Sequence, residues 1–335
     1  MTQAAAIEKP KTASLDALYK LIQNDLKKVD ALILDRVKSQ VPLISHVASH
    51  IIASGGKRIR PALTLISAQL CGYTGERHIQ LAAAVEFIHT ATLLHDDVVD
   101  ESKIRRGLAT ANELFGNKAS ILVGDFLLSQ AFQLMVGDGS LKVLKILSDA
   151  AAVISKGEVM QLMMEGQPET TVENYLQVIS SKTAVLFAAA CELGAVVSGQ
   201  ENREEALREF GIYIGLAFQL IDDALDYTAD EAILGKTVGD DFREGKITLP
   251  VILAYNAGNE AEKRFWQRTL SEMIQEKGDL EEARFFMRQY DAIGQTIAMA
   301  KRYCQKAALA LSTFDPSPAR GAMLDIADFC ASREY

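Results

Sequence analysis

The sequence predicts an all-α protein, a single large bundle of long antiparallel helices around a deep central cavity. Only one of the seven prolines, Pro168, lies between Pro61 and Pro250, and proline interrupts helices. The long segments between these positions are rich in Ala, Leu, Glu, Gln and Met, which are good helix formers. No segment shows the sustained period-two alternation that is typical of a half-buried strand, so we expect no strands.

The first helix is predicted by apolar residues at steps of three and four, the period of an amphipathic helix. These residues are Leu15, Leu18, Ile22, Leu26, Val29, Ile33 and Val37. Later helices are separated by stretches rich in glycine or proline, which interrupt regular structure. The breaks fall at Gly55-Gly56, Gly137–Ser140, Gly166–Pro168, the segment 235–246 and Asp315–Pro318. After the third break, Thr170 and Glu173 form a capping-box pattern that predicts a helix start.

Length and composition limit the class of protein. A chain of 335 residues suggests about two domains at roughly 150 residues each, but none of the breaks resembles a long polar linker. We therefore expect one helical domain, residues 14–335, after a flexible polar tail, residues 1–13. The net charge of −9 opposes binding to a nucleic-acid backbone, so we expect no nucleic-acid partner.

Nothing in the sequence indicates secretion or a membrane span. The N-terminus lacks the apolar core of a signal peptide, and no uninterrupted apolar run approaches the roughly 18 residues of a spanning helix. The four cysteines are far apart and form no C-x-x-C pair, as expected for reduced intracellular thiols. We expect a cytoplasmic protein.

Two segments share the pattern apolar-x-D-D-x-x-D, each at the end of an apolar helical stretch. The first acid motif contains Asp96, Asp97 and Asp100, and the second contains Asp222, Asp223 and Asp226. Residues four apart share one face of a helix, so the outer carboxylates of each motif project together. These charges repel one another and oppose the helix dipole. A divalent cation would offset that cost, and Mg²⁺ typically combines one or two carboxylates with water and substrate phosphates.

Two basic clusters complete the prediction of a polyphosphate site. One contains Lys57, Arg58 and Arg60 beside Gly55-Gly56, and the other contains Lys103, Arg105 and Arg106 directly after the first acid motif. Arginine and lysine are the usual partners of phosphate groups. The nucleotide-binding patterns G-x-x-x-x-G-K-[ST] and G-x-G-x-x-G are absent. One E-x-x-H pattern ends at His89, but di-iron bundles need two.

Together these motifs resemble the bacterial trans-polyprenyl diphosphate synthases. The matching blocks occur in family order between Gly55 and Pro250: GGKRIRP, HTATLLHDDVVDESKIRRG, GNKASILVGDFLLSQAF, SKTAVLF, FQLIDDALDYTAD and LGKTVGDDFREGKITLP. The resemblance implies the class I isoprenoid synthase fold, a homodimer, and Mg²⁺-dependent coupling of isopentenyl diphosphate to an allylic prenyl diphosphate.

The resemblance also assigns roles to residues. The six aspartates would hold Mg²⁺. The allylic diphosphate would contact Arg105, Lys182 and Lys236; isopentenyl diphosphate would contact Lys57, Arg60, His89 and Arg106. Thr183 and Gln219 would face developing positive charge, and the catalytic set would be Lys182, Thr183, Gln219 and Lys236. Chain length would depend on Ala91, Thr92 and Phe132, with Phe132 as a floor residue on the facing helix.

Small Ala91, five residues before Asp96, predicts an open path for a long product, because shorter-chain relatives resemble one another in placing bulky aromatics there. We expect octa- to decaprenyl diphosphate, for ubiquinone side chains, and a transient membrane contact during its release. Alternatives are a geranylgeranyl or farnesyl diphosphate synthase and a non-catalytic subunit of a heteromeric synthase. A terpene cyclase would carry N-D-x-x-S-x-x-x-E as its second motif, which differs from the second acid motif here.

Overall fold

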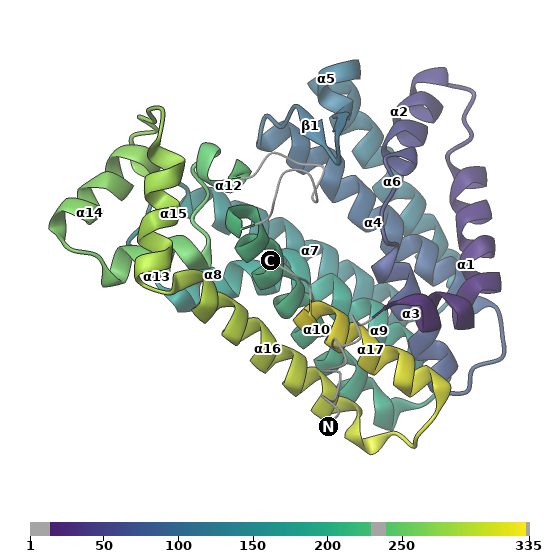
Figure 1. Ribbon diagram of the computed structural model, residues 1–335. Helices are drawn as coiled ribbons and strands as arrows, with labels where there is room; N and C mark the ends of the chain where they lie inside the picture. Colours follow the sequence, from purple (N-terminus) through teal and green to yellow (C-terminus); the bar gives the residue numbers. More distant parts are fainter. Residues whose placement is uncertain (1–13, 229–238, 333–335) are drawn as a thin grey trace, which may run out of the picture.

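The computed structural model describes residues 14–228 and 239–332, and its regular structure is almost entirely helical (Figure 1). The all-α prediction is confirmed, while the predicted tail, residues 1–13, lies outside the described residues. Six helices in the described ranges contain 19 residues or more: α1 (Asp16–Arg36), α4 (Arg77–Val99), α6 (Asn117–Asp138), α7 (Leu141–Met164), α10 (Glu201–Thr228) and α16 (Ala292–Ala310).

Shorter helices connect and cover the long ones. In the first part of the chain they are α2 (Pro42–Ala53), α3 (Ile59–Leu70), α5 (Ala111–Phe115), α8 (Val172–Ile179), the π-helical turn η1 (Ser180–Ala184) and α9 (Val185–Val197). In the second part they are α12 (Asp240–Arg243), α13 (Leu249–Ala257), α14 (Glu260–Trp266), the π-helical turn η2 (Gln267–Ser271), α15 (Asp279–Gln289), the 3₁₀ turn η3 (Leu311–Thr313) and α17 (Pro318–Ser332). Figure 1 shows α13, α14 and α15 on one side of the molecule and α1, α2 and α5 on the other.

One small hairpin corrects the expectation of no strands. Strands β1 (Ile104–Arg105) and β2 (Leu108–Ala109) pair antiparallel, with Ile104 opposite Ala109. The two residues between them, Arg106 and Gly107, have φ of 53° and 76°, as a tight two-residue hairpin turn requires. Strands of two residues are too short to show an alternation of apolar and polar residues in the sequence. The hairpin matters because it holds two of the predicted phosphate-binding arginines.

The start of α8 lies one residue later than the capping-box pattern predicts. Thr171 is the N-cap, and its hydroxyl accepts a hydrogen bond from the Asn174 N–H at 3.2 Å. Thr170 instead donates its own N–H to the Gln167 carbonyl at 3.0 Å and is buried. The turn after Gly166 therefore uses Thr170, which leaves capping to the next threonine.

The centre of the bundle is formed by α3, α9 and α10, with α4 packed against α6 and α16 against α10. Small residues allow unusually close helix contacts. A Cβ atom added at Gly211 of α10 would lie 2.5 Å from the Phe187 carbonyl oxygen and 2.6 Å from the Ala188 Cα of α9. A Cβ at Gly194 of α9 would lie 2.5 Å from the Ala68 backbone nitrogen of α3. These contacts set the spacing between α3, α9 and α10, and α10 carries the second acid motif.

Two helical segments are long and apolar enough to cross a membrane by composition, Asn117–Asp138 and Val172–Val197. Within their most apolar windows, 50% and 72% of the residues are buried inside the protein. The second segment therefore owes its apolar character to its place in the core, since helices of a bundle centre are hydrophobic on most sides. The first segment, which is α6, keeps an exposed apolar side.

Replacing Gly211 by alanine should destabilise the bundle, because backbone atoms of α9 would have to move away from the new methyl group. We expect the free energy of unfolding to fall by about 1–3 kcal/mol, measured by urea denaturation. Gly321→Ala in α17 is the matched control, since a Cβ there meets nothing within 4 Å and alanine favours a helix. Equal stability of Gly211→Ala and wild type would contradict the close packing of α9 and α10.

Candidate active site

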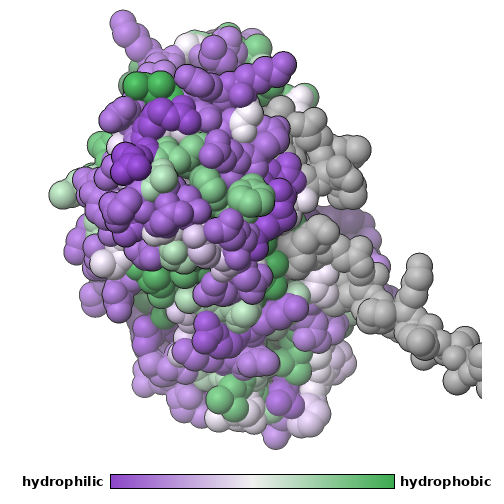
Figure 2. Space-filling model, turned by 60° about the vertical axis from the view of Figure 1, so that its left-hand side comes forward, coloured by the Kyte–Doolittle hydropathy of each residue, from purple (hydrophilic) through white to green (hydrophobic). Residues whose placement is uncertain are grey.

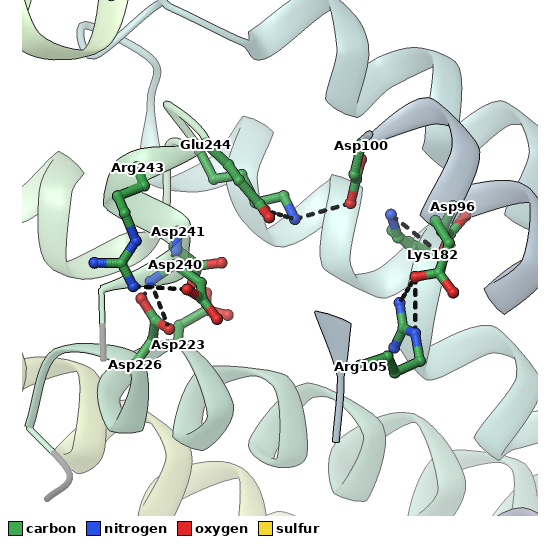
Figure 3. Close-up of polar contacts among 12 residues, drawn as sticks. Asp96, Asp100, Arg105, Lys182, Asp223, Asp226, Asp240, Asp241, Arg243 and Glu244 are labelled. Atoms are coloured by element: carbon green, nitrogen blue, oxygen red, sulfur yellow. Dashed lines mark hydrogen bonds and ion pairs between the residues drawn. The ribbon is translucent and has the colours of Figure 1, made fainter. Parts of the chain in front are cut away.

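The two acid motifs lie at the C-terminal ends of α4 and α10 and face each other across a polar site (Figure 3). Asp100 is the C-cap of α4, and Asp226 lies in the last turn of α10. Both helices therefore direct the negative ends of their dipoles toward the same site as their carboxylates. The structure thus brings together six acidic residues whose motifs are more than a hundred positions apart.

The three carboxylates of the first acid motif have different surroundings. Asp96 lies 3.6 Å from the Lys182 ammonium and Asp100 lies 2.9 Å from that of Lys246. Asp97 is fully buried, and its Oδ1 accepts hydrogen bonds from Arg105 Nε at 2.8 Å and Nη2 at 2.7 Å. Among the described residues, its Oδ2 has no hydrogen-bond partner. Asp96 and Asp100 therefore face the cations of the site, whereas Asp97 holds Arg105.

The second acid motif divides in a similar way. Asp222 is exposed, whereas Asp223 is 3% exposed. Asp223 accepts hydrogen bonds from the Tyr175 hydroxyl and, at 2.8 Å, from the Gln219 amide. The carboxylate of Asp226 accepts the backbone N–H groups of the first two residues of α12, at 3.2 Å and 3.0 Å. The central carboxylate of each motif is thus engaged by protein groups, in the first motif by Arg105 and in the second by Tyr175 and Gln219.

Burial and mutual repulsion leave this site with more negative charge than its surroundings stabilise. Burial raises the pKa of Asp96. Burial, and then the charge of Asp241, raise the pKa of Asp223 to about 7 and that of Asp226 to about 8. Carboxylates resist ionisation in this way when desolvation and like charges outweigh the available cations. An additional cation at the site would restore the ionised forms.

The acidic residues fit a metal that shares its ligands with a substrate. Within the two described ranges, no group of three or more His, Cys, Asp or Glu residues could hold a metal ion by itself. Mg²⁺ usually takes only one or two protein carboxylates and completes its shell with water and phosphate oxygens. The excess negative charge and the unpartnered Oδ2 of Asp97 agree with a cation that arrives together with a diphosphate.

A cavity of about 150 Å³ opens beside the second acid motif. Its polar lining includes Lys182, Thr183, Gln219, Asp223 and Lys246, and its apolar lining includes Met164, Val178, Ile179 and Ile247. The turn η1 contributes Lys182 and Thr183. The Thr183 hydroxyl donates to the Gln219 side-chain oxygen at 2.9 Å. The predicted residues Lys182, Thr183 and Gln219 are therefore brought together, and Lys236 lies outside the described residues.

A second, strongly positive part of the site surrounds His89 on α4. Arg60 Nη1 lies 3.0 Å from His89 Nε2, and Arg60 Nε is buried with no hydrogen-bond partner in the part of the chain that the structure describes. Burial and then the charge of Arg60 lower the pKa of His89 well below its usual value, with further contributions from Arg106, Arg105 and Arg58. Burial lowers the pKa of Arg60 to about 10. His89 is thus neutral among cations, an arrangement suited to a bound anion.

Arg106 packs into this positive region, whereas Lys57 lies at its border. The Arg106 guanidinium packs over Gly56, where an added Cβ would lie 2.7 Å from Nη1, so the two basic clusters of the sequence converge. Lys57 is exposed, and its ammonium lies 4.6 Å from the ring centroid of Phe329 in α17. Lys57 therefore borders the site beside the C-terminal helix rather than packing with Arg60.

The predicted chain-length residues do not line the cavity. Ala91 is 2% exposed in the core of α4, and the Thr92 hydroxyl donates to the His89 carbonyl at 2.8 Å. Phe132 is 39% exposed on α6. Phe132 does not line this cavity, because α6 buries Ala131 and Leu134 and turns Phe132 outward; its role as a floor residue stays a prediction.

Several residues of the site were missed by sequence reasoning. Lys246 bridges Asp100 and Glu244, at 2.9 Å and 2.7 Å, and Glu158 of α7 accepts from Lys182 at 2.7 Å. Tyr175 holds Asp223. A signal existed for Lys246, which follows glycine in GDDFREGK as Lys236 does in LGK. Nothing local in the sequence distinguishes Glu158 or Tyr175.

Comparisons with known proteins agree with this geometry. Residues 41–287 match the family model described as polyprenyl synthetase. Octaprenyl diphosphate synthase of Escherichia coli strain K12 is 45% identical over 322 residues, which cover 96% of this chain and 99% of that protein.

Two solved structures share the fold over nearly the whole chain. A polyprenyl synthase of Caulobacter crescentus CB15, complexed with calcium and isoprenyl diphosphate, is 47% identical with a TM-score of 0.93, covering 97% of this chain and 99% of that one. A decaprenyl diphosphate synthase of Rhodobacter capsulatus is 46% identical with a TM-score of 0.92, covering 96% and 99%. The chain therefore belongs to the polyprenyl synthetase family and is a prenyltransferase.

Proposed function

We propose that this prenyltransferase adds isopentenyl diphosphate repeatedly, in the trans configuration, to an allylic prenyl diphosphate and releases octa- to decaprenyl diphosphate. The observation that carries the proposal is the convergence of two acid motifs with a separate arginine–histidine pocket. One part of the site can hold a diphosphate through a metal, and the other through cations alone. This division suits a reaction in which one diphosphate leaves and the other remains attached.

Isoprenoid diphosphates and a divalent metal go with membership of this family, and we assign the metal as Mg²⁺. All six aspartates are candidate ligands, and Asp223 is the least available of them, because it is 3% exposed and accepts hydrogen bonds from the Tyr175 hydroxyl and the Gln219 amide. When bound, Mg²⁺ would offset the charge that develops on the departing allylic diphosphate. Lys182 and Lys246 lie against the same carboxylates and would add positive charge there, with Arg105 and Lys236.

The cavity beside the second acid motif is suited to the allylic cation. Its apolar side chains limit access of water, which would otherwise capture the cation. The hydroxyl oxygen of Thr183 and the amide of Gln219 form a fixed chain that ends on Asp223. Oxygen dipoles held in this way stabilise positive charge without acting as nucleophiles. We assign the final proton acceptor to the departing diphosphate.

The pocket around His89 would bind isopentenyl diphosphate. Arg60 offers a buried Nε donor without a partner, and Arg106 lies over Gly56 at the edge of the same pocket. Lys57 would add a mobile charge from the outside. Isopentenyl diphosphate keeps its diphosphate during the proposed reaction. Its pocket therefore has to bind the diphosphate but not to help it leave, and arginine and lysine side chains are sufficient for that without a metal.

The proposal of a long product rests on two kinds of support, and its use in ubiquinone side chains remains a prediction. The relatives described above are named octaprenyl and decaprenyl diphosphate synthases, and Ala91 occupies little volume where the chain would pass along α4. Such an apolar product also supports a brief membrane contact during release from a cytoplasmic enzyme.

An exposed apolar side of α6 supports a homodimer. Ile121, Leu122, Phe132 and Val136 are 42%, 67%, 39% and 65% exposed, which is unusual for four large apolar residues on one helix. By contrast, hydrophilic residues predominate on the face shown in Figure 2. We propose that a second copy covers α6, so that Phe132 of each copy lies at the interface.

The direct test is an assay of the isolated chain with isopentenyl and farnesyl diphosphates and Mg²⁺, with products resolved by reverse-phase chromatography. We expect products of eight to ten isoprene units, and no product after chelation of the metal. A chain that forms no product alone would instead support the non-catalytic subunit, and products of three or four units would support the shorter-chain alternative.

Replacing Asp96 by asparagine should remove a metal-facing carboxylate while keeping its size. We expect kcat/KM to fall by about 10²–10³-fold, the usual cost of losing one charge-stabilising group, with a rise in the Mg²⁺ concentration needed for half-maximal rate. Asp149→Asn is the control, since Asp149 is exposed and pairs with exposed Lys145 at 2.6 Å. An unchanged metal requirement would argue against Asp96 as a ligand.

Replacing Ala91 by phenylalanine should shorten the product, because an aromatic ring five residues before Asp96 would block the path along α4. Product length is measured by the same chromatography, and the rate of the first condensation should remain within a fewfold of wild type. Unchanged long products from a folded variant would refute this account of chain length.

A further inference from the structure

Glu86 is a buried acidic residue that the assignments above leave without a function. It lies on α4 three residues before His89, hence on the same side of the helix. Its side chain is 8% exposed and pairs with Arg58 Nη1. A buried carboxylate is stable only with a close cationic partner, so Glu86 and Arg58 depend on each other.

Arg58 stands at the bend that presents the first basic cluster. Its φ of 46° is left-handed, a conformation that residues with a side chain adopt only when the surroundings hold it. The surroundings are two acids on different helices: Glu86 of α4 accepts from Nη1, and Asp30 of α1 lies 3.7 Å from Nε. The carbonyl of Arg58 in turn accepts the Ala62 N–H at 3.0 Å and so begins α3.

The charge of Glu86 also acts on the arginines that face the pocket. Burial lowers the pKa of Arg60, and burial and then the charge of Arg105 lower the pKa of Arg106; in both cases the carboxylate of Glu86 opposes the shift. Glu86 thus offsets repulsion within the cluster. The Glu86 carboxylate accepts a hydrogen bond from Arg58, and among the described residues the Nε of Arg60 has no hydrogen-bond partner, so this donor is available to a ligand.

We propose that Glu86 is a positioning residue for the homoallylic diphosphate pocket: through Arg58 it holds the bend 55–60 in place behind the arginines without contacting the substrate. The inference rests on the proposed function, since it takes isopentenyl diphosphate as the ligand of that pocket. The contacts of Glu86 described above lie within this pocket, so we expect its replacement to affect binding of isopentenyl diphosphate more than binding of the allylic substrate.

The test compares Glu86→Gln with wild type in steady-state kinetics. We expect the KM for isopentenyl diphosphate to rise at least tenfold, with kcat at saturation and the KM for farnesyl diphosphate within about twofold. Glu76→Gln, at the start of the same helix, is the matched control, because Glu76 is 78% exposed and pairs with Lys28 on the surface. A change shared by both substrates would indicate a general structural effect and overturn the proposal, as would a lower KM for isopentenyl diphosphate.

A double-mutant cycle tests the route through Arg58. If Glu86 acts by holding Arg58, Arg58→Met and the double variant Arg58→Met/Glu86→Gln should raise the KM for isopentenyl diphosphate to a similar extent, and strictly additive effects would overturn the proposal. The double variant leaves no buried charge unpaired and covers the case in which Glu86→Gln fails to fold. Calorimetric titration with isopentenyl diphosphate separates the hypotheses: no binding to wild type contradicts the proposed function, whereas equal binding to wild type and Glu86→Gln contradicts only the positioning role.

Discussion

The repulsion among buried carboxylates is the constraint on which the rest of this structure depends. Two long helices end at one site with their dipoles and their aspartates directed toward it, and neither end would be stable alone. The protein offsets part of this charge with Lys182 and Lys246, which reach Asp96 and Asp100 from other elements. The remainder gives the site its affinity for a divalent cation and a diphosphate.

Close packing of the central helices keeps the repelling carboxylates in fixed positions. Glycines of α9 and α10 allow backbones to approach within contact distance of their neighbours, so the helices have little freedom to move apart. The central aspartate of each motif is used inside the protein, Asp97 for Arg105 and Asp223 for Tyr175 and Gln219. The metal-facing carboxylates are thereby held by a second layer of bonds rather than by their own backbone alone.

Sequence reasoning predicted the helical fold from periodicity, and the i, i+4 rule placed the outer aspartates of each motif on one helix face. That the acid and basic motifs form one site was expected from their complementary charges and from the family resemblance. Sequence reasoning did not predict the hairpin at Ile104–Ala109, whose strands have two residues each. It also did not predict that Asp97 binds Arg105 while Asp96 faces the site, and it did not identify Lys246, Glu158 or Tyr175 as residues of the site. These depend on which helix ends meet in space, and no local pattern in a single sequence encodes that.

The pairing of Lys246 with Asp100 also has a consequence for folding of the protein during its synthesis. The two residues are 146 positions apart, and at 5–20 residues per second a ribosome would need about 7–30 s to synthesise the interval. During that time the first acid motif has none of the offsetting charge that Lys246 will supply. The end of α4 therefore lacks this ion pair until the nascent chain has emerged past α12.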